Sequence, residues 1–159
     1  EAGRTGLPII LSTGMATIQE IKTAFCAVDI PFTPPTDLTL LHCVSSYPCA
    51  PKDANLLAIM SMQITFGLKI GYSDHCQGYV ACLAAAAMGA VMIEKHFEFR
   101  YGAPSVDHDV CINEAQLADM VRDIRTIEQM LGSGIKAPCE AEKVNIPLVR
   151  KRADGRKLA

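Results

Sequence analysis

The feature that most limits the fold of this chain is its alternation of short apolar runs with longer helical segments. The apolar runs predict strands over residues 7–11, 38–44, 68–72 and 90–93. Capping and periodicity predict helices over residues 17–28, 53–66, 79–88 and 113–131. Strands that alternate with helices in this way form a parallel sheet with right-handed crossovers. The sequence therefore predicts an α/β protein, either an open doubly wound sheet or half of a (β/α)8 TIM barrel.

Three of the helix starts carry capping signals. Thr17 followed by Glu20 fits a capping box, and Asp53 is a candidate cap for the second helix. Asn113 is the expected cap of the fourth helix, which has the most regular pattern. Its apolar face combines Leu117, Met120, Val121, Ile124, Ile127 and Leu131 at three- and four-residue spacing.

The composition narrows the class of protein. The 159 residues are 50% hydrophobic and 20% charged, which is typical of a globular domain with its own core. A net charge of −2 gives no reason to expect a nucleic-acid or anionic-membrane partner. The longest uncharged run, residues 78–93, is shorter than the about 20 residues that a membrane-spanning helix needs. Neither GxGxxG nor GxxxxGK[ST] occurs, so no nucleotide-binding motif supports a nucleotide site.

The cysteines favour a reducing compartment, and we expect a cytoplasmic protein. Their number is odd and no CxxC pair occurs, so buried free thiols explain them better than disulfides do. The seven positions are Cys26, Cys43, Cys49, Cys76, Cys82, Cys111 and Cys139. A second interpretation stays open, in which Cys43, Cys76 and His75 bind zinc in a non-catalytic domain.

Polar side chains stand at the end of every predicted strand. They are Ser12, Thr13, His42, Ser45, Tyr47, Ser73, Asp74, His75, Glu94, Lys95 and His96. The carboxyl ends of parallel strands share one rim, which is where α/β proteins build their active sites. Hydroxyls and glycine amides at such a rim suit a phosphate or a carboxylate.

His75 and His96 follow two successive strands, so both imidazoles could bind one divalent metal ion. A metal with open positions would polarise a substrate carbonyl. Either histidine alone would be more simply explained as structural, and the pairing favours the metal site. His42 lies within an apolar strand, where a core histidine and a functional one are equally expected.

The neighbours of the two histidines have structural alternatives. Asp74 could simply cap the following helix, and either Glu94 or Lys95 could form an ion pair on the outer side of the strand. Asp107, in the loop after the fourth strand, could be a general base, a partner of a metal ligand or a solvated loop residue.

Several motifs together resemble the sialic acid synthase family. They are PIILSTGM, LLHCVSSYP with a following PxDxNL, IGYSDH, GAxxIEKHF and a loop that contains DH. The resemblance implies a (β/α)8 barrel followed by a small antifreeze-like domain. Residues 1–137 resemble the second half of that barrel, strands 5 to 8. Residues 138–159 resemble the linker towards the antifreeze-like domain.

The resemblance also implies a metal site and a phosphoenolpyruvate site. His75 and His96 match the two metal ligands of the family, usually for Mn²⁺, with Mg²⁺ or Co²⁺ as alternatives. Ser12 and Ser73 match positions that contact phosphoenolpyruvate. The lysines and acids that complete the phosphoenolpyruvate site in the family belong to strands that this chain does not contain.

Three further residues match the sugar side of the family's site. Tyr47 and Ser45 match positions near the amino sugar, and Asp107 matches a loop carboxylate near the metal and the substrate. The implied reaction condenses phosphoenolpyruvate with an N-acetylated amino sugar such as N-acetylmannosamine, with Asp107 and Tyr47 as catalytic residues. The implied protein is a homodimer in its full-length form, and we expect the four βα units alone to be inactive. Another phosphoenolpyruvate-dependent aldol synthase, acting on a sugar phosphate, remains the alternative enzyme.

Overall fold

The computed structural model describes residues 5–27, 38–99, 104–151 and 156, and the side chains at 25–27 are not among the described ones. Its strands are β1 (Ile9–Ser12), β2 (Leu38–Cys43), β3 (Lys69–Asp74) and β4 (Ile93–Lys95). Its longer helices are α1 (Ile18–Ala27), α2 (Leu57–Phe66), α3 (Val80–Ala87) and α4 (Glu114–Leu131). Short helical turns are η2 (Pro51–Asp53), η3 (His108–Val110), α5 (Glu140–Lys143) and α6 (Ile146–Val149).

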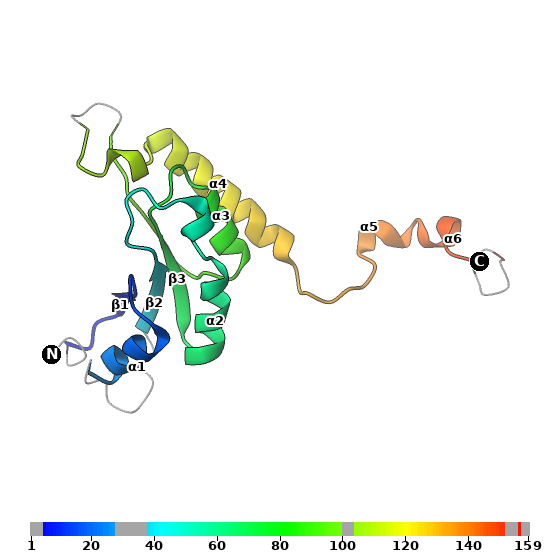
Figure 1. Ribbon diagram of the computed structural model, residues 1–159. Helices are drawn as coiled ribbons and strands as arrows, with labels where there is room; N and C mark the ends of the chain where they lie inside the picture. Colours follow the sequence, from blue (N-terminus) through cyan, green and yellow to red (C-terminus); the bar gives the residue numbers. More distant parts are fainter. Residues whose placement is uncertain (1–4, 28–37, 100–103, 152–155, 157–159) are drawn as a thin grey trace.

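The four strands form one parallel sheet in the order β1-β2-β3-β4 (Figure 1). A doubly wound sheet would reverse its strand order at a switch point. Each strand here pairs with the next one along the chain, and α2, α3 and α4 lie on the same side of the sheet (Figure 1). The parallel α/β prediction is confirmed, and the sequential order decides for half of a (β/α)8 barrel.

The core lies between the sheet and the helices. Alternate residues of β2 and β3, among them Leu40 and Tyr72, point to the helical side, because successive side chains of a strand face opposite ways. There they pack against Ile21 of α1 and Ile59 of α2, both less than 5% exposed. The other face of the sheet carries the residues between them, and its strand ends hold the polar side chains.

Two helix starts agree with the sequence prediction. The carboxylate of Glu20 accepts hydrogen bonds from the backbone and the hydroxyl of Thr17, and the hydroxyl of Thr17 accepts one from the Glu20 N–H. At α4, the Asn113 side chain accepts from the Gln116 N–H, and the Gln116 side chain accepts from the Asn113 N–H, both at 3.0 Å. These reciprocal bonds satisfy backbone donors that the first turn of a helix leaves free.

The predicted cap at Asp53 is wrong. Asp53 lies in the short turn η2, and α2 begins four residues later with Leu56 at its N-cap position and no side-chain cap. Asn55, between the two elements, adopts a left-handed backbone with φ 44°. This reversal separates η2 from α2, and a helical pattern in the sequence does not reveal it.

The predicted bounds of the last two strands also need correction. β3 extends through Ser73 and Asp74, and β4 spans Ile93–Lys95 rather than residues 90–93. The backbone pairing of Asp74 with Lys95 extends both strands into polar residues. Apolarity alone therefore placed the strands too early, because hydrogen bonding to the neighbouring strand defines where they end.

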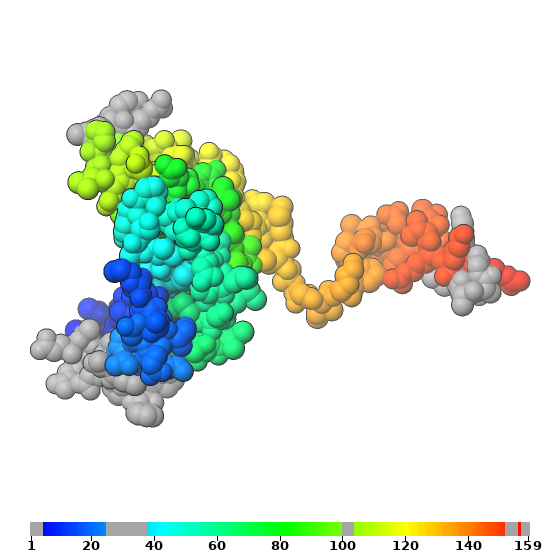
Figure 2. Space-filling view, viewed as in Figure 1, coloured from blue at the N-terminus to red at the C-terminus, as the bar shows by residue number. Residues whose placement is uncertain are grey.

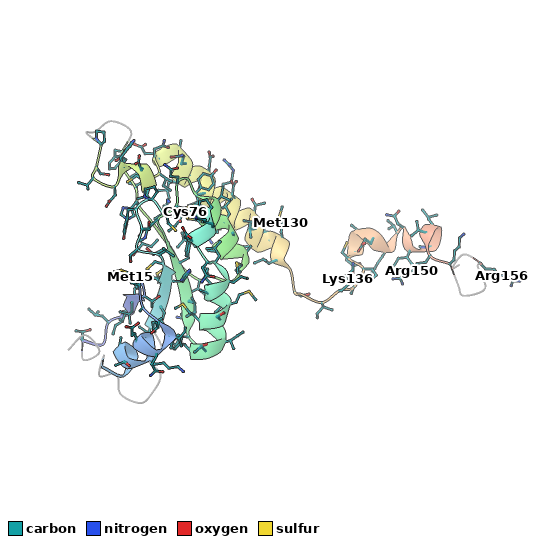
Figure 3. All side chains as sticks on the ribbon, viewed as in Figure 1. Met15, Cys76, Met130, Lys136, Arg150 and Arg156 are labelled. Atoms are coloured by element: carbon teal, nitrogen blue, oxygen red, sulfur yellow. The ribbon has the colours of Figure 1, made fainter. Side chains whose placement is uncertain are left out.

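The C-terminal segment stands clear of the body that holds the sheet (Figure 2). It carries α5 and α6, and Lys136 and Arg150 lie along it, away from the helical layer (Figure 3). Its described residues are exposed except for Ile146, which is partly buried. Residues 152–155 and 157–159 of the predicted linker lie outside the described part. None of the described helices combines the length and apolarity needed to cross a membrane.

Candidate functional site

The strand-end site lies on the face of the sheet opposite the helices. We define it by Tyr47, Ser73, His75, Glu94, His96 and Asp107. On β3 the side chain of Asp74 faces the helical layer, where Cys82 of α3 donates to it. Ser73 and the following His75 therefore face the other side, which would be the interior of a closed barrel. Strand alternation brings these polar groups to the rim that the sequence predicted.

Three rings form the centre of the strand-end site. The ring centroids of His75 and His96 are 5.3 Å apart, with 71° between the planes. Tyr47 lies 4.1 Å from His75 and 5.6 Å from His96, again between centroids. The structure thus brings together both predicted metal ligands and one predicted sugar-site residue.

The imidazole of His75 is held in one tautomer. Its Nδ1 lies 2.7 Å from the carbonyl oxygen of Val44. A carbonyl can only accept, so Nδ1 carries a proton and donates it, and Nε2 is the nitrogen that remains available to a metal. An imidazole oriented in this way by a backbone carbonyl is the usual arrangement of a metal-binding histidine.

Acidic side chains flank the two imidazoles. Oδ2 of Asp107 lies 3.7 Å from Nδ1 of His96. The hydroxyl of Ser73 donates to Oε1 of Glu94 at 2.6 Å, across the β3–β4 pair. No group of three or more His, Cys, Asp or Glu side chains converges as a metal site in the described residues. Two imidazoles therefore fit a metal only if substrate, water or further protein groups supply the remaining ligands.

Glu94 belongs to the strand-end site, although the sequence did not decide whether Glu94 or Lys95 would face it. It lies opposite Ser73 in the strand register and shares its face. Strand alternation was the available signal, since Glu94 and Lys95 must point to opposite sides. The prediction that one of the two forms an ion pair is confirmed for Lys95, which pairs with Asp74 at 3.0 Å.

Ser12 and Ser45 are less directly connected to the strand-end site. Ser12 ends β1 with an exposed side chain, two strands away from β3. Ser45 follows β2 and lies next to Gly14, which belongs to the loop after β1. A Cβ on Gly14 would collide with the Ser45 hydroxyl. The described contacts do not test a substrate role for either serine, which stays a prediction.

His42 is a core histidine. Its Nε2 lies 2.9 Å from the carbonyl oxygen of Ala54, and its ring stacks on Tyr72 with 5.9 Å between centroids. The side chain is buried and satisfied on the helical side of the sheet. Of the two interpretations that the sequence left open, the structural one is confirmed.

The zinc site of the non-catalytic interpretation is wrong. Cys43, Cys76 and His75 all lie in the described part, and they do not form a metal-binding group there. Cys76 is buried among the side chains near the helical layer, and burial together with the negative charge of Asp74 raises its pKa to about 11 (Figure 3). His75 faces the opposite side, so strand alternation separates the thiol from the imidazole.

Tyr47 presents its hydroxyl as a proton donor. Loss of hydration raises the pKa of the Tyr47 phenol above its ordinary value, and the charges of Cys43, Asp107 and Glu94 raise it further. A phenol with a raised pKa stays protonated at neutral pH. The side chain is 51% exposed, so a ligand can reach it.

The fold and this site define a (β/α)-barrel protein with a polar site at the carboxyl ends of its strands. The sequence model of the NeuB family matches residues 1–136. The chain therefore belongs to the NeuB family.

Several curated relatives of the chain are named as synthases of sialic-type acids. It is 40% identical to the N,N'-diacetyllegionaminic acid synthase of Campylobacter jejuni over 90% of this chain and 43% of the relative. It is 34% identical to the N-acetylneuraminate-9-phosphate synthase of Mus musculus over 95% of this chain and 43% of the relative. The chain thus spans less than half the length of these curated relatives.

A solved structure shares the fold. The N-acetylneuraminic acid (sialic acid) synthetase from Leptospira borgpetersenii, crystallised with citrate, superposes with a TM-score of 0.81 at 37% identity. The superposition covers 91% of this chain and 50% of that one. The expected relationship to the sialic acid synthase family is confirmed.

Proposed function

We propose that this chain supplies the second half of the barrel of a synthase that joins phosphoenolpyruvate to an N-acetylated amino sugar. The products are a nine-carbon 2-keto acid of the sialic type and phosphate. The observation that carries the proposal is the pairing of His75 and His96, with His75 oriented by the hydrogen bond from its Nδ1 to the Val44 carbonyl. Membership of the NeuB family supports the same reaction class.

A divalent metal, with Mn²⁺ as the first candidate and Mg²⁺ or Co²⁺ as alternatives, would be held by His75 and His96. When bound there, it would draw electron density from the carbonyl of the open-chain sugar. The protein's own residues then have defined tasks. His75 and His96 would hold the metal, and the hydroxyl of Tyr47, whose ring lies beside both imidazoles, would donate a hydrogen bond to the sugar.

The bond changes follow from the substrates. Carbon 3 of phosphoenolpyruvate attacks the sugar aldehyde, whose oxygen takes up a proton, and water adds at carbon 2. Phosphate then leaves with cleavage of its C–O bond and takes the proton of the new carbon 2 hydroxyl, which yields the keto group. Asp107, 3.7 Å from His96 and partly exposed, takes up the proton of the attacking water. Ser12 and Ser73 contact phosphoenolpyruvate, and Ser45 contributes to the sugar pocket.

The test is keto-acid formation by the full-length protein from phosphoenolpyruvate and N-acetylmannosamine, with and without Mn²⁺. We expect metal-dependent product in the wild type and its loss in His75→Ala, while the His42→Gln control retains activity. If product forms only from other N-acetylated amino sugars, the proposed substrate would be replaced and the proposed reaction would stand. Exclusive use of a sugar phosphate would favour the alternative aldol synthase, and no product with any amino sugar would contradict the proposal.

We propose in addition that residues 138–159 link the barrel to an antifreeze-like domain, that the full-length protein is a homodimer and that it works in the cytoplasm. Exposure of the segment around α5 and α6 supports the linker role. Free thiols at all described cysteines support a reducing compartment. Within the described residues β1 and β4 each pair with a single strand, and these open edges lead us to expect that the four βα units alone self-associate and are inactive. A soluble, active monomer of this chain would contradict that expectation.

A further inference from the structure

A buried ion pair lies directly behind the two histidines. Nζ of Lys95 is 3.0 Å from Oδ2 of Asp74, and the two side chains are 3% and 0% exposed. Asp74 pairs with Lys95 in the β3–β4 register. Each partner directly precedes one of the histidines, Asp74 before His75 and Lys95 before His96.

The ion pair also hydrogen-bonds to the backbone of Cys76, the residue after His75. Oδ1 of Asp74 accepts from the N–H of Cys76 at 2.9 Å, and Nζ of Lys95 donates to the Cys76 carbonyl oxygen. The two peptide groups of Cys76, directly after His75, are therefore tied to Asp74 of β3 and Lys95 of β4. These bonds connect the segment after His75 to the strand that leads into His96.

Tyr72 of β3 and Cys82 of α3 complete the surroundings of Asp74. The Tyr72 hydroxyl donates to Oδ1 at 3.0 Å, and the Cys82 thiol of α3 donates to Oδ2 at 3.2 Å. Asp74 thus accepts four donors, which is the full capacity of a carboxylate. Every buried side-chain nitrogen or oxygen in the described part of the chain has a hydrogen-bond partner.

Stability alone does not explain this arrangement. Desolvation of two charges offsets most of their attraction, and apolar replacement of such a pair is often neutral or stabilising. A buried ion pair contributes most clearly where it fixes the relative position of two segments of the backbone. Here the geometry that it fixes is the spacing of the two strand ends that carry His75 and His96.

We propose that Asp74 and Lys95 are positioning residues, which hold His75 and His96 at the separation that lets both bind one divalent cation. The inference rests on the proposed function, because it assumes that the two histidines bind a metal. It adds two residues on the helical side of the sheet that would not contact substrate.

The test is Mn²⁺ binding by the full-length protein, measured from the electron paramagnetic resonance signal of the free ion. The variants are Asp74→Asn, Lys95→Met and the double variant Asp74→Asn with Lys95→Met. Each single variant leaves a buried charge without its partner and should lower the Tm. The double variant removes both charges and should recover much of the Tm.

Mn²⁺ affinity separates positioning from stability. We expect the double variant to bind Mn²⁺ at least about 10-fold more weakly than wild type, as loss of groups that orient metal ligands usually does. The matched control is Asp119→Asn with Arg122→Met, which removes an exposed ion pair of α4 and should leave the affinity within about twofold. Should the double variant fail to fold, Lys95→Arg serves instead, because it keeps the positive charge beside Asp74 but changes the length and shape of the side chain that joins the two strands.

Two outcomes would overturn the inference, and they are distinguishable. Wild-type affinity in the folded double variant would show that the pair is merely structural, while the proposed metal site would stand. Absence of saturable Mn²⁺ binding in the wild type would remove the proposed metal site and this inference with it.

Discussion

The ring of Tyr47 lies against the imidazole of His75, with 4.1 Å between the centroids and 33° between the planes. Tyr47 comes from the loop after β2, and His75 follows β3. The backbone supports this contact, since the N–H of Cys49 donates to the carbonyl of His75 at 2.8 Å. One loop therefore carries both a potential sugar contact and a support for a potential metal ligand.

Substitutions at Tyr47 should separate its hydroxyl from its ring. Tyr47→Phe keeps the ring contact, so we expect Mn²⁺ affinity within about twofold of wild type but a fall in kcat/KM of about 10-fold, equivalent to one lost hydrogen bond of about 1.4 kcal/mol. Tyr47→Ala should weaken metal binding as well. Steady-state kinetics and metal titration of both variants check this, and equal effects of Phe and Ala on metal binding would contradict it.

Gly71 should not tolerate a side chain. A Cβ at this position would lie 2.5 Å from Cδ2 of Leu41 and 2.8 Å from the carbonyl oxygen of Met92. Both neighbours are crowded, so Gly71→Ala should lower the free energy of unfolding by about 1–3 kcal/mol. Urea denaturation measures the change. Ser61→Ala, on the exposed side of α2, is the control and should stay within about 0.5 kcal/mol.

The loop that carries Asp107 should loosen in acid. The Ser105 N–H and the His108 ring donate to Glu98, and these bonds lower the pKa of Glu98 below its ordinary 4.5. A carboxyl whose pKa is lower in the folded state stabilises the fold above its unfolded pKa. That contribution is lost as the pH falls through the folded pKa.

Nuclear magnetic resonance can follow this titration directly. We expect the Ser105 amide shift to titrate with an apparent pKa below 4.5, the ordinary Glu98 value. In Glu98→Gln the same amide should show no such step. A titration of Ser105 that persists in the variant would assign the effect to another group.

The cysteines should differ sharply in reactivity. Burial raises the pKa of the Cys82 thiol and, together with Asp74, that of Cys76 to about 11, whereas Cys139 is exposed. Only the thiolate reacts with iodoacetamide. Mass spectrometry at pH 8 should therefore find Cys139 alkylated first and Cys76 and Cys82 unmodified until urea is added. Early alkylation of Cys82 in the folded protein would contradict its burial.

Local sequence signals predicted much of the fold. The capping pairs Thr17–Glu20 and Asn113–Gln116 form within a few residues, so the bonds depend on neighbours that the sequence already specifies. The predicted cap at Asp53 was wrong because Asn55 adopts a left-handed backbone between Asp53 and the start of α2. The fourth strand was placed too early because its bounds depend on pairing with β3, a contact between distant segments.

In the strand-end site, too, local sequence patterns specified some features and contacts between distant segments specified the others. The sequence by itself determined which polar residues stand at the strand ends and that His75 and His96 would share a rim, because parallel strands have a common direction. Only the tertiary structure decided that His42 is a core residue, that Val44 fixes the tautomer of His75 and that Asp74 pairs with Lys95. These outcomes depend on distances between segments far apart in the chain, which no local pattern of residues encodes.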